Sequence, residues 1–379
     1  MSALSRNPRF RRRVVAGAMA AGVVLVAGCG SSSSDAGSDG GGAAADTAAA
    51  EAMVAKYGEP LTSVDLPPLE KTPEAGKSVV FVTNNIPESQ YLAEGSIAAA
   101  KLLGWNAKSI VYDASSPTGL TAAFAQAVDE APDGVMTNAT NTTDYAAAAK
   151  EFAAKNIPVV TSNTTDPIGA PIIANVADPS QYELAGKIVA SYVVAQKGDE
   201  ASVAMFNIPS FPILKAYEDA FKAEFLRLCP DCHYESHAVQ PGDIGTKIPS
   251  QVVSAIQRNP SINFASMGFG AVGTGVSGAL ASAGLNDTKI IGIQPTTENL
   301  EATSNGTEDM WLASPITGMG WKSVDALARY FNGEDVEVAT KAQVPFVIIT
   351  KDNAEDYMPR AEVDGGDYEA VFEPIWKLN

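Results

Sequence analysis

Short apolar runs alternate with longer amphipathic segments along the chain from Lys77 onwards. The runs have the length of buried strands, and the segments between them repeat apolar residues with the period of a helix. Strands separated by helices of about 10–15 residues indicate a parallel sheet with right-handed crossovers. The expected strands lie at 78–82, 109–112, 134–137 and 158–161, and the expected helices at 89–103, 120–130 and 145–155.

The alternation then starts again with a helix in which Leu184, Ile188 and Val193 share one face. Two consecutive doubly wound sheets predict two similar lobes. Ligands of such sheets bind at the carboxyl ends of the strands, so we expect a cleft where the two sets of strand ends face each other. The second set consists of strands at 202–206, 262–267, 289–293 and 346–349, with helices at 184–193, 213–228, 251–258, 273–283 and 324–331.

The N-terminal segment has the three parts of a secretory signal. Five arginines between Arg6 and Arg13 form a basic head, and an uncharged apolar stretch runs from Val14 to Gly28. The motif VAGC that ends at Cys29 resembles the bacterial lipobox, which implies cleavage before Cys29 and a diacylglyceryl group on its sulfur. An uncleaved membrane helix is the alternative, but the stretch is shorter than the ~20 residues that span a bilayer.

Residues 1–28 are therefore expected to be a lipoprotein signal peptide, and residues 29–76 a flexible tether. The tether is rich in Gly, Ala, Ser and Asp and then in Pro, a composition that cannot bury a core. A short helix is expected at about 52–57, and folded structure is expected to begin near Lys77.

Composition narrows the functional classes. Hydrophobic residues make up 46% of the chain and charged residues 18%, which is the balance of a globular protein. The net charge of −18 becomes more negative when the arginines of the leader are removed. So acidic a chain should repel nucleic acid and anionic lipid surfaces. Only two histidines are present and no nucleophile motif is found, so we do not expect an enzyme.

Several short segments, taken in order, resemble the type I periplasmic solute-binding proteins of the ribose and galactose class. They are the helix at 95–104, the strand at 157–160, the Ala185-Gly186 pair, the helix at 216–221, the strand at 291–293 and Gly320. The resemblance runs from about Lys77 to Tyr357. It implies an α/β fold of two doubly wound parallel-sheet lobes joined by a three-strand hinge. Lactose-repressor relatives share this fold, but they carry a DNA-binding helix pair where this chain has a leader.

The resemblance also implies how the chain divides. The first lobe is expected to contain residues 77–176 and 316–342, and the second lobe residues 177–315 and 343–379. The chain should cross between the lobes near Val176, Pro315 and Ala342. Closure of the lobes about these crossings, with ligand trapped between them, is the expected mechanism.

The ligand contacts of the family, carried over by position, fall on loops at the strand ends. Asn138 matches an Asn that the family uses on sugar hydroxyls, whereas neutral or apolar residues replace most of the other contacts. Asn163 and Gln294 stand in place of Asp, Tyr217 of Arg, Met267 and Gly268 of an Asn-Asp pair, Ser314 of Gln, and Ile86, Glu88 and Ser89 of an Asn and two stacking aromatics.

These replacements share a direction, because ionised partners make the stronger hydrogen bonds to sugar hydroxyls. A neutral, less hydroxylated or partly apolar ligand is therefore expected, with weak binding of ribose, galactose and glucose. The alternative for Asn138 and Asn163 is that each bonds its own turn. Aromatic residues near these loops are either cleft or core residues, namely Phe206, Phe211, Trp311 and Trp321.

Two motifs suggest other chemistry. Cys229-Pro-Asp-Cys232-His233 fits c-type haem attachment, and with His237 it offers zinc ligands, but a local disulfide is favoured in an exported protein. The glycines of 268–273 and 273–278 match a dinucleotide fingerprint. In a doubly wound lobe they also suit tight turns and close helix–sheet packing, so we expect no cofactor and no metal.

Taken together, the sequence predicts a monomeric, lipid-anchored, extracytoplasmic solute-binding protein. It would capture a small neutral molecule, sugar-like or partly apolar, and deliver it to the permease subunits of an ABC importer. One alternative is a sensor module that presents its ligand-bound form to a membrane receptor or kinase. A weaker alternative is a haem or redox protein that uses Cys229 and Cys232.

Overall fold

The computed structural model describes residues 44–58, 66–342, 345–359 and 367–378. The predicted signal peptide at 1–28, the lipidated Cys29 and the first part of the predicted tether lie outside the described residues. The folded part belongs to one compact unit, Gly42–Asn379. Within the described part, no helix combines the length and the apolar character needed to cross a membrane.

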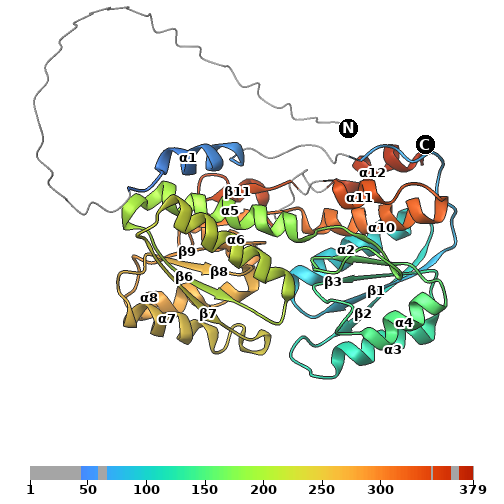
Figure 1. Cartoon of the computed structure of the whole chain (residues 1–379), viewed down its shortest axis with the longest axis horizontal. Helices are drawn as coiled ribbons and strands as arrows, with labels where there is room; N and C mark the ends of the chain where they lie inside the picture. Colours follow the sequence, from blue (N-terminus) through green and yellow to red (C-terminus); the bar gives the residue numbers. More distant parts are fainter. Residues whose placement is uncertain (1–43, 59–65, 343–344, 360–366, 379) are drawn as a thin grey trace, which may run out of the picture. The chain divides into compact units, whose positions relative to one another are not determined.

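The first sheet is parallel throughout, in the order β2-β1-β3-β4-β5. Figure 1 shows α2 and α10 on one side of it and α3 and α4 on the other. Because both faces are covered, the central strands are almost wholly buried, which explains their continuous apolar runs. The strands are β1 Ser78–Asn84, β2 Asn106–Tyr112, β3 Gly134–Asn138, β4 Val159–Ser162 and β5 Ile172–Asn175, and the helices α2 Pro87–Leu102, α3 Gly119–Glu130, α4 Ala146–Ala154 and α10 Ile316–Asn332.

The second sheet has the order β11-β10-β9-β8-β6-β7 and is parallel except for β11, which is antiparallel to β10. Helices α5 and α6 cover one side and α7 and α8 the other (Figure 1). The prediction of two doubly wound lobes is confirmed. The strands are β6 Ser202–Asn207, β7 His233–Ala238, β8 Phe264–Met267, β9 Lys289–Ile293, β10 Met310–Ala313 and β11 Val347–Thr350, and the helices α5 Pro179–Lys197, α6 Pro212–Leu228, α7 Ile248–Arg258, α8 Val276–Ser282 and α9 Thr297–Asn305.

In each lobe a pair of helices packs backbone against backbone through glycine. A Cβ atom at Gly320 of α10 would lie 2.3 Å from the carbonyl oxygen of Leu92 in α2. In the second lobe, a Cβ atom at Gly186 of α5 would lie 2.4 Å from the carbonyl oxygen of Tyr217 in α6. Only glycine permits such close approach, which explains why the sequence carries it at both positions.

Between β1 and β11 the chain passes from one lobe to the other at three points: from β5 to α5, from β10 to α10, and from α11 (Glu337–Lys341) to β11. These passages fall near Val176, Pro315 and Ala342. A buried lysine of the first lobe holds the start of the third passage: the Lys322 ammonium of α10 donates a 2.6 Å hydrogen bond to the Ala342 carbonyl.

Folded structure begins earlier than Lys77, contrary to the sequence-based expectation. Helix α1 spans Thr47–Lys56 rather than residues 52–57 and lies along α5 (Figure 1). Its Ala50 is fully buried, and the Asp46 amide donates a 2.7 Å hydrogen bond to the Leu228 carbonyl of α6. The alanines that made this segment look like a tether are strong helix formers, and they supply a flat surface for packing.

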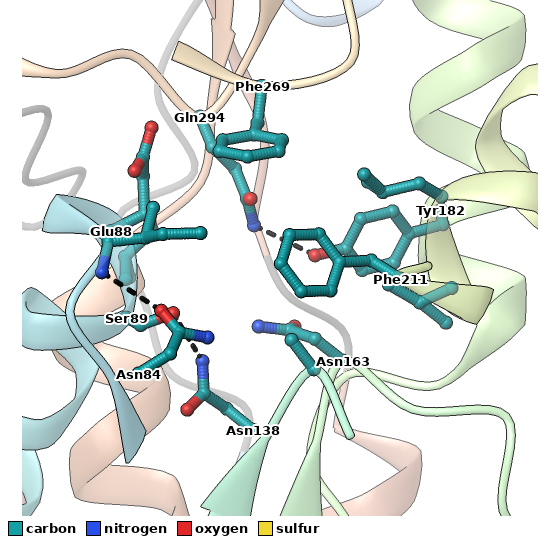
Figure 2. Close-up of a pocket in the computed structure, with 14 residues that line it drawn as sticks. Asn84, Glu88, Ser89, Asn138, Asn163, Tyr182, Phe211, Phe269 and Gln294 are labelled. Atoms are coloured by element: carbon teal, nitrogen blue, oxygen red, sulfur yellow. Dashed lines mark hydrogen bonds between the residues drawn. The ribbon is translucent and has the colours of Figure 1, made fainter. Parts of the chain in front are cut away.

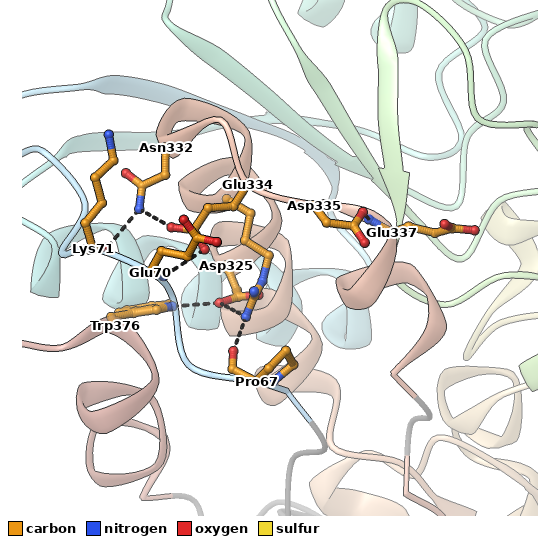
Figure 3. A network of polar contacts seen from close by, with 10 residues as sticks. Pro67, Glu70, Lys71, Asp325, Asn332, Glu334, Asp335, Glu337 and Trp376 are labelled. Carbon is orange, nitrogen blue, oxygen red and sulfur yellow. Dashed lines mark hydrogen bonds and ion pairs between the residues drawn. The ribbon is translucent and has the colours of Figure 1, made fainter.

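The C-terminal helix α12, Tyr368–Trp376, packs on α10 of the first lobe, whereas the predicted division places residues 343–379 with the second lobe. The Trp376 and Trp321 rings stack with their centroids 5.6 Å apart. The Trp376 indole donates a 2.9 Å hydrogen bond to Asp325, which also pairs with Arg329 at 2.7 Å (Figure 3). The stacking of Trp376 on Trp321 and its hydrogen bond to the buried Asp325 carboxylate hold α12 against α10.

Three strands of the described part were not predicted from the sequence: β5, β7 and β10. The β7 strand is at the edge of its sheet, and none of its residues is buried, so its sequence His-Tyr-Glu-Ser-His-Ala shows no apolar run. The β5 and β10 strands have four residues each, as do β4, β8 and β11, which were predicted, so length does not explain why they were missed. Helix α9 was also missed, because its apolar residues are few.

Cys229 and Cys232 form a disulfide at the end of α6, with their Cα atoms 5.4 Å apart. This agrees with the favoured prediction, and it leaves neither sulfur free as the thiol that haem attachment or zinc binding needs. No group of three or more His, Cys, Asp and Glu side chains in the described ranges is arranged to hold a metal ion.

Candidate ligand-binding site

A pocket lies at the carboxyl ends of strands from both sheets, which is where open α/β sheets bind ligands. Figure 2 shows side chains converging on it from both lobes. From the first lobe the lining residues are Asn84, Ile86, Glu88, Ser89, Asn138, Ala139, Asn163 and Ile316, and from the second Tyr182, Phe211, Ile213, Leu214, Phe269 and Gln294.

Three of the lining residues directly follow a strand and have a left-handed backbone. Ala139, Asn163 and Gln294 come after β3, β4 and β9, with φ values of 54°, 57° and 53°. Such values are uncommon for residues other than glycine, and they tend to gather at functional sites. The sharp turn at each strand end presents the Asn163 and Gln294 side chains to the pocket (Figure 2).

Hydrogen bonds within the first lobe fix the orientation of two pocket side chains. The Asn138 amide accepts a 3.1 Å hydrogen bond from the Thr83 hydroxyl and donates one of 2.9 Å to the Ser89 hydroxyl. The Asn84 side-chain oxygen accepts a 3.0 Å hydrogen bond from the Ile86 amide. Asn138 therefore serves chiefly to position Ser89, and the Asn84 amide nitrogen is turned toward the pocket.

Three buried polar atoms of the first-lobe wall have no hydrogen-bond partner within the described part of the chain. They are the amide nitrogen of Asn84, the amide oxygen of Asn163 and one carboxyl oxygen of Glu88. Buried polar atoms are normally satisfied, and leaving one unpaired costs about 1–3 kcal/mol. This wall consequently offers a ligand the Asn84 donor, the Asn163 acceptor and a Glu88 oxygen that accepts when the carboxyl group is ionised and donates when it is protonated.

The second-lobe wall is mainly apolar. The Phe211 and Phe269 rings lie 6.1 Å apart at an angle of 56°, beside Ile213 and Leu214. Its polar groups bond each other, because the Gln294 amide donates a 3.0 Å hydrogen bond to the Tyr182 hydroxyl. Burial raises the pKa of Tyr182, so this phenol stays neutral. The pocket thus has one polar wall and one aromatic wall.

Glu88 is the one acid among the described lining residues, and it is only 6% exposed. One carboxyl oxygen accepts a 2.8 Å hydrogen bond from the Ala271 amide, which belongs to the second lobe. Burial raises the pKa of Glu88 to about 7, against the lowering effect of its backbone hydrogen bonds. The pocket therefore holds at most one negative charge and no positive one.

The structure brings together six of the residues predicted from the sequence: Ile86, Glu88, Ser89, Asn138, Asn163 and Gln294. Ser314 lines a smaller adjoining cavity that shares Tyr182 and Gln294 with the pocket. That these residues contact ligand stays a prediction.

Four other predicted residues lie in the protein core instead of the pocket. Phe206 is fully buried in β6 and stacks on His237, with ring centroids 4.9 Å apart. Tyr217 and Met267 are fully buried within α6 and β8. A Cβ atom at Gly268 would lie 2.4 Å from the Asn207 side-chain oxygen, so this glycine serves packing. Trp311 and Trp321, also considered for the cleft, are core residues.

Several lining residues are absent from the sequence-based prediction, chiefly Asn84, Tyr182 and Phe269. Asn84 ends β1 as Asn138 ends β3, so the same strand-end signal applies to it. Tyr182 lies on the first turns of α5 and Phe269 on the turn after β8. Tyr182 and Phe269 lie beside the first-lobe residues of the pocket only because the two lobes meet there. Contact between segments far apart in the chain leaves no pattern in the local sequence.

Comparison with known proteins places the chain among described folds. The family described as "Periplasmic binding protein domain" matches residues 78–335, which confirms the resemblance predicted from the sequence. It is a family of binding proteins, in agreement with the expectation that the chain is not an enzyme. A search of curated protein sequences gave no significant match.

Solved structures resemble the chain at low sequence identity. An ABC transporter solute-binding protein from Agrobacterium vitis, bound with alpha-D-tagatopyranose, has a TM-score of 0.66 and 20% identity, covering 74% of this chain and 96% of that one. Another from the same organism, with bound allitol, has a TM-score of 0.65 and 18% identity, covering 74% and 97%. A carbohydrate transporter from Acidothermus cellulolyticus, in complex with myo-inositol, has a TM-score of 0.63 and 18% identity, covering 76% and 99%. At such identities the likeness shows the fold.

Proposed function

The chain belongs to the periplasmic binding protein domain family, and from that premise we propose that it is an extracytoplasmic solute receptor. It captures one small neutral molecule between its two lobes and delivers it, as a monomer, to the permease subunits of an ABC importer. The observation that supports this function best is the pocket lined from both lobes at the strand ends.

The solute has a hydroxylated edge and an apolar face. The unpaired amide nitrogen of Asn84 and the unpaired oxygens of Asn163 and Glu88 suit hydroxyl groups, which both donate and accept hydrogen bonds. The Phe211 and Phe269 rings opposite suit an apolar face. The similar structures hold a ketose, an acyclic polyol and a cyclitol, all neutral hydroxylated molecules. With few ionised partners, simple pentoses and hexoses should bind weakly.

Identification of the solute tests this function. Small molecules released by denaturing natively purified protein are identified by mass spectrometry. Their binding is then measured by calorimetry beside ribose, galactose, glucose, tagatose, allitol and myo-inositol. We expect a neutral, partly apolar molecule to bind more tightly than ribose, galactose or glucose. Micromolar or tighter binding of one of those three sugars would contradict the predicted preference, and an anionic solute would contradict the ligand class.

Closure of the lobes accompanies capture. The three passages near Val176, Pro315 and Ala342 are the hinge. Because residues of both lobes line the pocket, both of its walls come together only when the lobes meet. Small-angle scattering should give a smaller radius of gyration with the identified solute than without it. Identical scattering profiles would argue against a hinge.

A lipid on Cys29 anchors the receptor to the membrane surface. This proposal depends on the sequence, namely the basic head, the apolar stretch and the VAGC motif. Cys29→Ala should release the protein from membranes or leave the precursor uncleaved, because the thiol is the site of acylation. A Cys29→Ala protein that stays both processed and membrane-bound would refute the anchor without affecting the solute-binding proposal.

A further inference from the structure

The Glu88 side chain connects the two lobes beside the pocket. It lies in the first turn of α2 in the first lobe, and its carboxyl oxygen accepts a 2.8 Å hydrogen bond from the amide of Ala271. Ala271 belongs to a short 3-10 helix, Gly270–Gly273, which follows β8 in the second lobe. In Figure 2 the carboxyl group points away from Asn84 and Asn138. This hydrogen bond therefore exists only when the lobes are together.

The surroundings of this carboxyl group favour its neutral form. Glu88 is 6% exposed, and its second oxygen has no partner among the described residues. The facing 3-10 helix carries only Gly, Ala and Val side chains. The titratable group that faces it from α5 is the buried phenol of Tyr182. No charged side chain of the described ranges stabilises a carboxylate here, so ionisation in the closed form is unfavourable.

We propose that Glu88 is a positioning residue that couples ligand capture to pH, because its carboxyl group must be protonated for the lobes to close most favourably. The inference rests on the proposed function in that it assumes an opening and closing of the lobes. When the lobes separate, the carboxyl group reaches water and ionises readily. Between pH 4.5 and pH 7 closure then takes up a proton from solvent, which is held by the Glu88 oxygen that does not accept from Ala271.

The direction and size of the effect follow from linkage. The pKa of Glu88 is raised from 4.5 to about 7 when it is buried between the lobes. A group whose pKa rises on closure favours closure most at pH below 4.5, and this contribution is lost as the pH rises through 7. Between pH 6 and pH 8, the equilibrium constant for closure should consequently fall by about tenfold.

Hydrogen exchange of the whole chain, followed by mass spectrometry, tests the proposal without any ligand. The probe is the Ala271 amide, read in peptides that cover residues 268–275 and corrected for the intrinsic pH dependence of exchange. In the wild type its protection should fall about tenfold from pH 6 to pH 8. Protection in the wild type that is equal at both pH values would overturn the proposal.

Three variants separate protonation from simple contact. Glu88→Gln keeps an oxygen that accepts from Ala271 but cannot ionise, so protection should be retained and become independent of pH. Glu88→Ala should lose protection at both pH values. Glu151→Gln removes the same charge from the exposed face of α4 and should behave as the wild type. A pH dependence that survives in Glu88→Gln would assign the effect to another group and overturn the proposal.

The test is independent of the solute. Failure of the pH effect leaves the solute-binding proposal intact, and failure to find a solute leaves the exchange measurement interpretable. Hydrogen exchange also distinguishes Glu88 from Glu308, the other buried carboxyl group whose pKa is raised to about 7. Peptides that cover residues 268–275 report on Glu88, and peptides that cover residues 299–311 report on Glu308.

Discussion

The pocket and the interior of α10 both bury polar side chains, but they differ in how many of the polar atoms have partners. On α10, both oxygens of Asp325 are bonded, to Arg329 and to the Trp376 indole. Arg329 also donates a 2.6 Å hydrogen bond to the Pro67 carbonyl, as Figure 3 shows around the labelled Asp325 and Pro67. In the pocket, by contrast, Asn84, Asn163 and Glu88 each have a buried atom without a described partner.

The difference separates a structural role from a binding role. A buried ion pair whose hydrogen bonds are complete needs no ligand to satisfy it, and here it joins α10 to the C-terminal helix and to the segment before β1. A buried amide that lacks a partner lowers stability by about 1–3 kcal/mol unless something else satisfies it. Strained backbone at Asn163 and Gln294 adds to this cost. Such a cluster at the strand ends is best explained by a ligand that completes it.

The largest effect is expected when the α10 pair is broken. Asp325→Ala leaves the Arg329 guanidinium and the Trp376 indole without their buried acceptor. Removing one partner of a buried pair costs about 3–5 kcal/mol, so the free energy of unfolding should fall by that amount in denaturant titrations. Affinity of the folded protein for its solute should be unchanged, because the pair does not line the pocket.

A matched control lies on the next helix. Lys341 and Glu337 form an i,i+4 pair like Arg329 and Asp325, but their side chains are 71% and 65% exposed instead of 4% and 0%. Glu337→Gln should leave stability unchanged, because water and salt screen an exposed pair. If Asp325→Ala lowered the free energy of unfolding no more than Glu337→Gln does, the α10 network would not stabilise the fold.

The sequence allowed part of the pocket to be predicted, but not the network of α10. Periodicity predicted both sheets because the strands contain short apolar runs, such as residues 79–82 in β1. Asn138, Asn163 and Gln294 were assigned by resemblance to the family, and each lies at or directly after the end of a parallel strand. Tyr217 and Met267, assigned by resemblance to the family, point into the core, and no residue pattern distinguishes that from the cleft.

The α10 network could not be predicted, because its partners are far apart in the chain. Arg329 bonds Pro67, and Asp325 bonds Trp376, with intervals of 262 and 51 residues. Local pattern shows only an amphipathic helix at α10. The same holds for Glu88 and Ala271, which are 183 residues apart and meet only through the contact of the lobes.

Removal of a pocket amide should affect binding more than stability. Asn163→Ala removes the unpaired oxygen, and Asn138→Ala removes the group that orients Ser89. Each should weaken binding of the identified solute by more than tenfold, about 1.4 kcal/mol, as measured by calorimetry. Because alanine is itself disfavoured at a φ of 57°, Asn163→Gly is the control for backbone strain. If Asn163→Gly bound the solute as tightly as the wild type, the Asn163 side chain would not be a ligand contact.

The smallest effect concerns a buried carboxyl group that, unlike Glu88, lies outside the pocket. Glu308 accepts hydrogen bonds from the Asn299 amide at 3.1 Å and the Trp311 indole at 2.7 Å, and burial raises its pKa to about 7. A pKa raised on folding gives stability that is complete below the ordinary value of 4.5 and is lost as the pH rises through 7. The wild type should therefore lose about 1 kcal/mol of stability between pH 6 and pH 8. Glu308→Gln keeps an oxygen for both donors and cannot ionise, so denaturant titrations should show a smaller loss over this range.

Solute affinity in Glu308→Gln should keep the pH dependence of the wild type, because Glu308 does not line the pocket. If Glu308→Gln abolished the pH dependence of binding and Glu88→Gln did not, the two carboxyl groups would have their roles reversed.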